Sequence, residues 1–281
     1  MTVAVVTDSA AALPAEFVER YRVTVVPMSI TVGGRTTRDG ETTLEAMLEA
    51  DLEAEDLETS GPSPGDFESA IEQCATDDGV LVLTIASTMS STYQSAVLAA
   101  DQVAGRVRVV DTQTAAGAEA LVVLAAARAA ASGAALDAVA AAAEEVISRV
   151  RLVATVPDLS YLARSGRVPG LAEHVSRRLG VAPLFEFVAG GVHPLRPALG
   201  LDAANGRLVH RVMSNREEGA GLHIAAYHAL RPEAADALLH GVERLLTPAS
   251  AFVGEFGSVM VAHTGPGLVG LAWWWEPGAG R

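Results

Sequence analysis

Short runs of apolar and β-branched residues alternate with helical patterns through the first half of the chain. The runs predict strands at Val3–Thr7, Val23–Met28, Gly79–Ile85 and Arg106–Asp111, the last two buried and parallel. Helices are predicted at Pro14–Tyr21, Ser91–Val103, Thr114–Arg128 and Leu136–Val150. Pro27 indicates that its strand lies at an edge or ends there, because proline cannot donate to a sheet ladder. This alternation predicts an α/β fold whose N-terminal parallel sheet is flanked by helices.

The pattern changes after about residue 150. Short helices are predicted at Leu159–Arg164 and Gly170–Leu179, and a longer one at Pro232–Leu246. The strands expected here are Pro183–Phe187, Val192–Leu195, Leu222–Ala229, Ala251–Phe256 and Ser258–His263. This mixture is typical of a second, α+β domain. We therefore expect two domains, 1–150 and 151–281, with a ligand between them.

Composition narrows the function classes. Every one of the 20 basic residues is arginine, so a P-loop lysine and Schiff-base chemistry are excluded. A formal charge of −14 argues against a nucleic-acid partner, which would need a basic face. The lone cysteine, Cys74, indicates a reducing, cytoplasmic setting. Arg128 interrupts the most apolar stretch and the N-terminus lacks a basic region, so we expect no signal peptide and at most transient membrane contact.

The segment VAHTGPGLVG fits a dinucleotide-binding pattern by letter, with glycines at 265, 267 and 270. A Rossmann fingerprint opens a βαβ unit of ~30 residues and needs an acidic residue ~20 positions later. Only residues 271–281 follow Gly270, and they include three tryptophans. The unit cannot be completed, so we reject the dinucleotide reading.

A second pattern, Gly61-Pro-Ser63-Pro-Gly65, matches the nucleophile elbow of hydrolases. The residue after the serine should donate its N–H to the oxyanion hole, but Pro64 has none. No strand is predicted before it either, since the acidic run Glu41–Glu58 favours a solvated helix and loop. We expect no elbow here.

Metal binding is not expected, because the histidines show no ligand-like spacing with one another or with Cys74. Each is more simply a surface or hydrogen-bonded histidine. They are His174, His193, His210, His223, His228, His240 and His263.

Four polar clusters fall at predicted strand ends or turns, and the carboxyl ends of strands are where open α/β sheets bind ligands. For Thr7-Asp8-Ser9 we favour helix capping. The segment Ser87–Tyr93 carries five serine and threonine hydroxyl groups ahead of a helix, which suits capping and anion binding equally. Thr59–Pro62 reads as an ordinary turn, and His263–Gly267 as the end of a strand. Together the clusters are typical of an anion site rather than of a hydrolytic centre.

The clusters also carry a family resemblance along nearly the whole chain. The chain resembles the DegV family of bacterial fatty-acid-binding proteins. The matching segments share the family's order and are TDSAAALP at 7–14, VVPM at 25–28, TSGPS at 59–63, STMSSTYQSA at 87–96, VVDT at 109–112, LSYLARSGRV at 159–168 and HTGPG at 263–267.

The resemblance implies a protein that buries the tail of one long-chain fatty acid and presents its carboxylate to a fatty-acid kinase. It therefore implies binding without catalysis and without a cofactor. By motif, the carboxylate contacts carry over to Thr59, Ser90 and His263. The neighbouring residues expected at the site are Ser60, Ser91, Thr92, Thr264 and Gly265. A partner surface is expected around Arg167 and Arg196.

Two departures from the family pattern stand out. Ser91 replaces a glycine usual between the serine and threonine of the hydroxyl segment, and Ser165 replaces the first glycine of a glycine-glycine-arginine motif. The rival hypothesis is an acyl hydrolase with Ser90 as nucleophile and His263 as base, with Asp8 as a conceivable orienting acid. A third alternative is a regulatory or structural protein whose apolar pocket holds no acyl ligand.

Overall fold

The computed structural model describes residues 2–54, 57–157, 159–166, 181–188 and 190–278. They form two compact units, one of residues 1–148 with 257–262 and one of residues 149–256 with 263–281. The helix expected at Gly170–Leu179 lies outside the described residues. The domain limits 1–150 and 151–281 stay a prediction, although the structure groups residues 257–262 with the first unit.

The first unit is built on a four-stranded parallel sheet. Its strands are β1 (Ala4–Asp8), β2 (Thr24–Val26), β6 (Val80–Thr84) and β7 (Val107–Asp111), in the order β2-β1-β6-β7. All four were predicted, and β2 is an edge strand as Pro27 indicated. β6 is wholly buried, but β7 is only half-buried because it forms the other edge. The expectation that both are buried was therefore wrong for β7.

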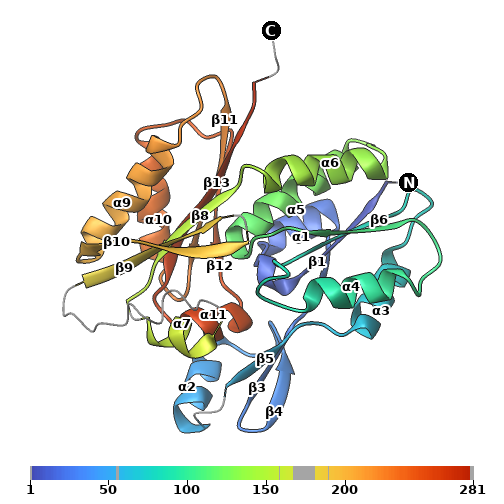
Figure 1. Cartoon of the computed structure of the whole chain (residues 1–281), viewed down its shortest axis with the longest axis horizontal. Helices are drawn as coiled ribbons and strands as arrows, with labels where there is room; N and C mark the ends of the chain where they lie inside the picture. The colour runs from blue at the N-terminus through green and yellow to red at the C-terminus, as the bar shows by residue number, and fades with distance from the viewer. Residues whose placement is uncertain (1, 55–56, 158, 167–180, 189, 279–281) are drawn as a thin grey trace. The chain divides into compact units, whose positions relative to one another are not determined.

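Helices cover both faces of this sheet, which confirms the predicted fold class (Figure 1). Helices α3 (Pro64–Cys74) and α4 (Thr92–Ala100) pack on one face, where Phe67 and Ile71 meet Val6, Val80 and Val82. The other face carries α5 (Ala116–Ala131) and α6 (Leu136–Ile147), and α1 (Ala15–Tyr21) packs against α5. A short turn, η1 (Ser9–Ala11), follows β1. The next strand of this sheet along the chain, β2, lies on one side of β1, whereas β6 and β7 lie on the other side. The carboxyl ends of β1 and β6 therefore form a topological switch point.

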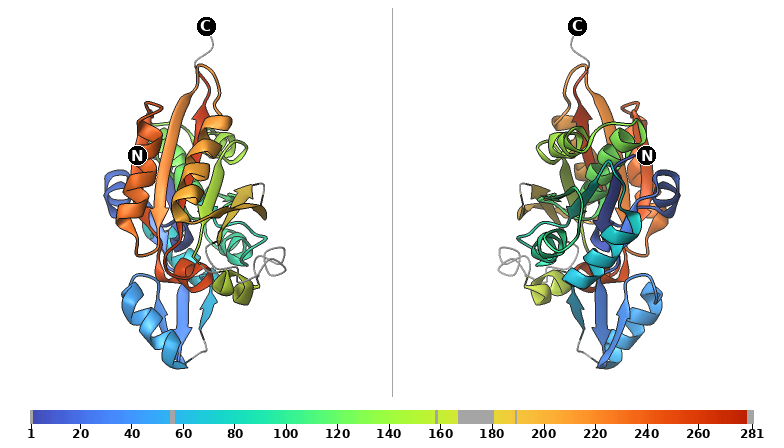
Figure 2. Two further views of the ribbon diagram at one scale, coloured as in Figure 1. Left: turned by 90° about the vertical axis from the view of Figure 1, so that its left-hand side faces the viewer. Right: turned by 90° about the vertical axis from the view of Figure 1, so that its right-hand side faces the viewer.

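A small antiparallel sheet in the same unit was missed in the sequence. Strands β3 (Ser29–Val32) and β4 (Arg35–Arg38) form a hairpin, and β5 (Glu58–Ser60) pairs with β3. Gly33 and Gly34 make the turn at φ 57° and 73°, which matches the right-handed twist of a hairpin. Helix α2 (Leu44–Ala54) packs beside β3 (Figure 2). Thr59 and Ser60, expected in a loop, therefore lie in a strand.

The second unit is built on a six-stranded mixed sheet in the order β10-β9-β8-β13-β11-β12. Its strands are β8 (Arg151–Thr155), β9 (Val181–Val188), β10 (Gly191–Leu199), β11 (Gly221–His228), β12 (Ser250–Glu255) and β13 (Val269–Glu276). Helices α9 (Leu201–Ser214) and α10 (Pro232–Glu243) cover one face, where Leu208 and Leu238 pack against Ile224 and Trp273. The strands β8 and β13 and the helix α9 were not predicted.

The strand expected at Ser258–His263 is wrong, because these residues form helix α11 (Ser258–Thr264). The alternating valines Val259 and Val261 favour a strand, and a short apolar run cannot by itself distinguish strand from helix. The helix ends where Gly265 adopts φ 75°, a left-handed conformation that commonly terminates helices.

Gly270 shows why the central strand of the second unit needs a glycine. A Cβ built on Gly270 would lie 2.8 Å from the carbonyl oxygen of Val153 and 2.9 Å from the Cβ of Ala154, both on the neighbouring strand β8. We expect Gly270→Ala to lower the free energy of unfolding by on the order of 2 kcal/mol, because backbone atoms would have to move. Urea denaturation followed by circular dichroism measures it.

Gly206 provides the matched control. It is exposed in helix α9, and a Cβ there would meet nothing within 4 Å. Gly206→Ala should therefore stabilise the protein by about 0.5–1 kcal/mol. Equal stability of the two alanine variants would contradict the steric argument for Gly270.

Candidate functional site

Hydroxyl groups gather where strand β6 leads into helix α4. The oxygens Ser90 Oγ and Thr92 Oγ1 lie 2.7 Å apart, and the Thr92 backbone N–H donates to Ser90 Oγ at 3.3 Å. Thr92 is buried and Ser90 is half-buried. Ser90 thus takes part in satisfying the helix N-terminus, as capping predicts. Its hydroxyl also remains part of a polar pair at the carboxyl end of the sheet.

Gly61 brings a second predicted segment to this pair. A Cβ on Gly61 would lie 2.6 Å from Thr92 Oγ1 and 3.2 Å from Ser90 Oγ. The chain just after β5 therefore passes so close to the two hydroxyls that only glycine fits without displacement. Sequence segments 59–63 and 87–96 are thus neighbours in the first unit.

The predicted site residues of these two segments differ in their exposure and in the direction of their side chains. Thr59 and Ser60 are consecutive in β5 and so point to opposite faces of its sheet. Thr59 is half-buried, while Ser60 and Ser91 are exposed. Ser91 has φ −75° and ψ 6°, which lies outside the left-handed region that favours glycine. The backbone at this position therefore does not require the family's usual glycine.

Carboxylates at neighbouring strand ends hold the hydroxyl segment in place. Asp111, the last residue of β7, accepts from the Ser87 N–H at 3.2 and 3.3 Å and from the Gln113 N–H at 2.8 Å. Thr112 Oγ1 donates to the carbonyl oxygen of Thr84 at 2.8 Å. No role was predicted for Asp111. The sequence signal that could have identified Asp111 is its position at the end of a strand parallel to β6, since the hydroxyl segment follows β6.

Asp8 performs the capping role that was predicted for it, and one more. One carboxyl oxygen accepts from the Ala10 N–H at 2.9 Å, and the other accepts from the Ile85 N–H at 2.9 Å. The side chain therefore joins the end of β1 to the end of β6. Burial raises the pKa of Asp8 to about 7, although both N–H groups oppose this shift and the charge of Asp39 adds to it.

Glu119 is a second buried acid near Asp8 that the sequence analysis missed. It lies in the first turn of α5 and is fully buried. Thr7 Oγ1 donates to Glu119 Oε1 at 3.4 Å, while Oε2 has no hydrogen-bond partner among the described residues. Burial raises its pKa well above the ordinary value, and the charge of Asp8 raises it further. The alanine-rich pattern of the helix gave no hint of this acid.

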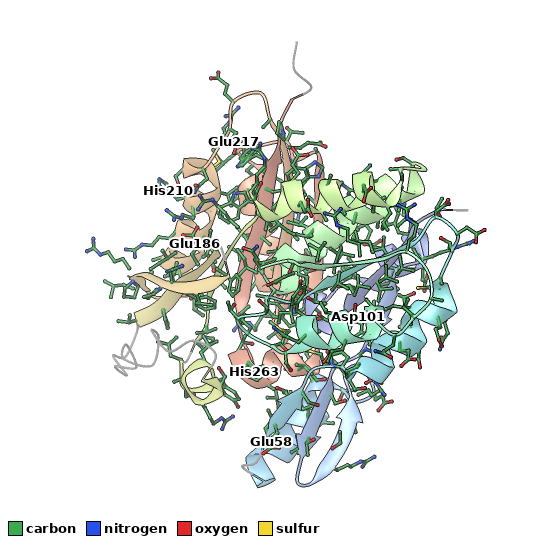
Figure 3. The ribbon with its side chains drawn as sticks, turned by 45° about the vertical axis from the view of Figure 1, so that its right-hand side comes forward. Glu58, Asp101, Glu186, His210, Glu217 and His263 are labelled. Atoms are coloured by element: carbon green, nitrogen blue, oxygen red, sulfur yellow. The ribbon has the colours of Figure 1, made fainter. Side chains whose placement is uncertain are left out.

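His263 and Thr264 occupy the last turn of α11 rather than the end of a strand (Figure 3). His263 is half-buried, and Thr264 is buried with its hydroxyl 3.3 Å from the carbonyl oxygen of Gly265. A Cβ on Gly265 would lie 2.5 Å from Tyr161 Cδ2, so Tyr161 lies against the 263–267 segment. Tyr161 belongs to α7 (Ser160–Ser165), and the guanidinium of Arg164 lies 4.8 Å from its ring centre.

The glycines of the apparent dinucleotide pattern therefore have structural uses. Gly265 makes room for Tyr161, Gly267 for Pro157, and Gly270 for strand β8. Gly267 also has φ 88°, and its N–H donates to the carbonyl oxygen of Ala229 at 2.9 Å. The loop is thereby fastened to the end of β11. This agrees with rejecting the dinucleotide reading.

The hydrolase alternative finds little support in these contacts. Ser63 of the apparent elbow is the N-cap of α3 and forms a capping box with Asp66. The hydrogen bonds of the Ser90 hydroxyl among the described residues are those with Thr92. Both oxygens of Asp8 are taken by backbone N–H groups, which argues against Asp8 as an orienting acid.

A cavity of about 450 Å³ in the second unit lies away from His263. Its lining includes Leu222 at the start of β11 and Trp275 at the end of β13, whereas the His263 loop joins the opposite ends of these strands. Figure 3 shows Glu217 of the cavity and His263 at opposite ends of this unit. The eight-residue strand β11 spans ~25 Å, so the cavity does not adjoin His263.

The remaining predictions concern the partner surface, metals and membranes. Arg196 is exposed on edge strand β10, and Arg167 lies outside the described residues. In the part of the chain that the structure describes, no group of acidic, histidine or cysteine side chains is arranged to hold a metal ion. The helices described there include none that is both long and apolar enough to cross a membrane.

Fold and site together define an α/β protein with a doubly wound parallel sheet, a mixed second sheet and hydroxyl groups at the switch-point edge. The chain belongs to the DegV family. A family model described as "Uncharacterised protein, DegV family" matches residues 2–276.

Known relatives cover almost the entire chain. A DegV domain-containing protein of Streptomyces coelicolor is 34% identical over 273 residues, 96% of this chain and 97% of its own. The structure of a fatty-acid-binding DegV family protein from Thermus thermophilus has a TM-score of 0.90 and 32% identity, covering 98% of this chain and 100% of that one. A DegV lipid-binding protein from Thermotoga maritima gives a TM-score of 0.88 at 28% identity, covering 98% and 99%.

The buried acids predict a pH dependence of stability. An acid whose pKa is raised on folding binds more protons in the folded than in the unfolded protein between the two pKa values. For Asp8 this window runs from its ordinary value of 3.8 to about 7, and stability falls as pH rises through it. Glu119 acts in the same direction, because burial raises its pKa well above its ordinary value.

We therefore expect Glu119→Gln to be more stable than the parent at high pH, where the parent's buried carboxyl must lose its proton, and to gain less at low pH, where that carboxyl is already uncharged. Urea denaturation at a series of pH values measures the difference. Glu145→Gln, on the exposed side of α6, is the control and should leave the pH profile unchanged. A Glu119→Gln profile parallel to the parent's would contradict a buried, uncharged Glu119.

Proposed function

We propose that this protein binds one long-chain fatty acid and presents its carboxylate to a partner fatty-acid kinase. The hydroxyls of Thr59, Ser90 and Thr92 hold the carboxylate, and His263 contributes a further contact. Ser60, Ser91, Thr264 and Gly265 belong to the surroundings of the bound group in this proposal.

The observation that carries the proposal is the hydrogen-bond balance of the Ser90–Thr92 pair. Two hydroxyls bring two O–H donors, and the 2.7 Å contact between them uses one. The pair therefore keeps one O–H for an outside acceptor. A carboxylate is such an acceptor, and a charge-assisted O–H···O⁻ bond is about twice as strong as a neutral one.

Neutral donors suit a carboxylate that must later react. A hydroxyl stabilises the ion without forming a salt bridge, so the carboxylate oxygen stays open to phosphoryl transfer from a kinase. The position agrees with the general rule that open α/β sheets bind ligands outside the carboxyl ends of their strands, at the switch point.

The relatives support the lipid as the ligand. The Thermus protein is described as binding fatty acid and the Thermotoga protein as binding lipid, and both match this chain over at least 98% of its length. Burying the tail would supply most of the affinity. At ~0.8 kcal/mol per methylene, a sixteen-carbon chain gains on the order of 10 kcal/mol before the costs of association.

Removing the Ser90 hydroxyl tests the carboxylate site. We expect Ser90→Ala to weaken fatty-acid binding roughly tenfold, because a hydrogen bond to a charged group is lost. Native mass spectrometry of the purified protein, followed by organic extraction and lipid analysis, measures the retained fatty acid, and titration measures its Kd.

Ser132→Ala is the matched control, because Ser132 is exposed at the end of α5 and donates to the carbonyl oxygen of Ala129. It should retain fatty acid like the parent. Unchanged retention in Ser90→Ala would refute the proposed contact. An empty parent protein that turns over p-nitrophenyl esters, with Ser90→Ala inactive, would support the hydrolase instead.

The kinase step has its own test. With a fatty-acid kinase and ATP, the loaded protein should yield acyl phosphate, which hydroxylamine traps as a hydroxamate. We expect Arg196→Glu to lower the rate severalfold without changing the fatty-acid Kd, since a reversed charge weakens docking. Arg35→Glu, exposed on β4, is the control. Equal rates for both variants would remove Arg196 from the partner surface.

A further inference from the structure

Asp39 contacts three separate segments of the first unit through its side chain and backbone. It follows β4, and its backbone N–H donates to the carbonyl oxygen of Met28 at 2.8 Å. One carboxyl oxygen, Oδ2, accepts from Ser9 Oγ at 2.7 Å. Ser9 Oγ in turn accepts from the Met28 N–H at 3.1 Å. Asp39 is therefore held from the side of β1 and β3.

The other carboxyl oxygen receives the start of helix α11. Asp39 Oδ1 accepts from Ser258 Oγ at 2.6 Å and lies 3.4 Å from the Val259 N–H, which also donates to it. A Cβ on Gly257 would lie 2.8 Å from Oδ2 and 2.9 Å from Oδ1, so only glycine lets the chain approach this closely. The contact joins residues that are 219 positions apart in the sequence.

These contacts place the Asp39 carboxylate at the N-terminus of α11, a helix too short to be stable in isolation. A carboxylate is favourable there because it accepts from unpaired N–H groups and complements the helix dipole. An isolated helix of seven residues is far below the length that is stable in water. The orientation of α11 therefore depends on what holds its ends, and Asp39 holds the first turn.

The last turn of the same helix carries His263. It lies five positions after Ser258, a rise of about 7.5 Å along the axis. Over so short a rigid element, a change in direction at the first turn moves the histidine directly. We propose that Asp39 is the positioning residue for His263, fixing the helix that aims this side chain at the fatty-acid carboxylate. This inference rests on the proposed function.

A double-mutant cycle tests the inference. The variants are Asp39→Ala, His263→Ala and the two combined, each titrated with a sixteen-carbon fatty acid. If Asp39 acts through His263, each single variant weakens binding about three- to tenfold, and the combined variant is no weaker than His263→Ala alone. Losses that multiply would overturn the inference, because Asp39 would then act independently of the histidine.

A spectroscopic readout separates positioning from a general loss of stability. In protein carrying ¹³C-labelled histidine, the His263 ring signal should shift on addition of fatty acid in the parent but not in Asp39→Ala. Asp39→Asn keeps one carbonyl oxygen for Ser258 and should restore part of the shift and of the affinity. Asp101→Ala, an exposed acid after α4, should behave as the parent. A parent-like shift in Asp39→Ala would overturn the inference.

Ser258→Ala serves where Asp39→Ala folds poorly, since it removes the same 2.6 Å contact from the helix side. It should weaken binding in the same direction, and parent-like binding would count against the inference. The proposed function fails separately, if the parent itself holds no fatty acid. A parent that binds fatty acid while His263→Ala binds it equally well overturns the positioning role alone.

Discussion

The hydrogen bonds of one buried carboxyl group organise the edge where ligand binding is proposed. Asp8 joins the N–H of Ala10 to that of Ile85, and so locks the ends of β1 and β6 together at the switch point. Two other carboxylates accept similar hydrogen bonds, Asp111 from the Ser87 N–H and Asp39 from the Ser258 hydroxyl. In each case a strand end or its following loop supplies the acid, and the start of another segment supplies the donor.

In this arrangement, the residues that hold the edge in place differ from the residues that are proposed to contact the ligand. The acids bind backbone and hydroxyl groups of the protein itself, while the hydroxyls of Ser90 and Thr92 keep a donor for an outside acceptor. The burial that raises the pKa of Asp8 and Glu119 also keeps negative charge away from the edge when these acids are protonated. An anion proposed to bind at that edge would meet less repulsion than the chain's net charge of −14 suggests.

Local pattern was enough for the four strands of the parallel sheet of the first unit, since they are dense in β-branched residues. Among the helices that flank this sheet, α3 was not predicted. Local pattern failed where distant contacts decide the outcome. Val259 and Val261 favour a strand, but Asp39 caps a helix there from 219 positions away. Strand β13 was not predicted, and its place in the sheet is set by pairing with β8 and β11, which are distant in the sequence. The glycine-containing helix α9 is set by Leu208 and Val212 packing on the sheet. At the site, the family motifs identified the hydroxyl groups. The close approach of Gly61 to these hydroxyls and the hydrogen bond that Asp111 accepts from Ser87 join residues distant in the sequence, and were not predicted.

The position of the tryptophans gives the protein a built-in optical reporter. All three, Trp273, Trp274 and Trp275, are consecutive on β13 and buried within the sheet of the second unit. The first unit has none of its own, so intrinsic tryptophan emission follows the second unit alone. Comparing that emission with far-ultraviolet circular dichroism, which reports on both, shows directly whether the two units lose structure in one cooperative step or in two.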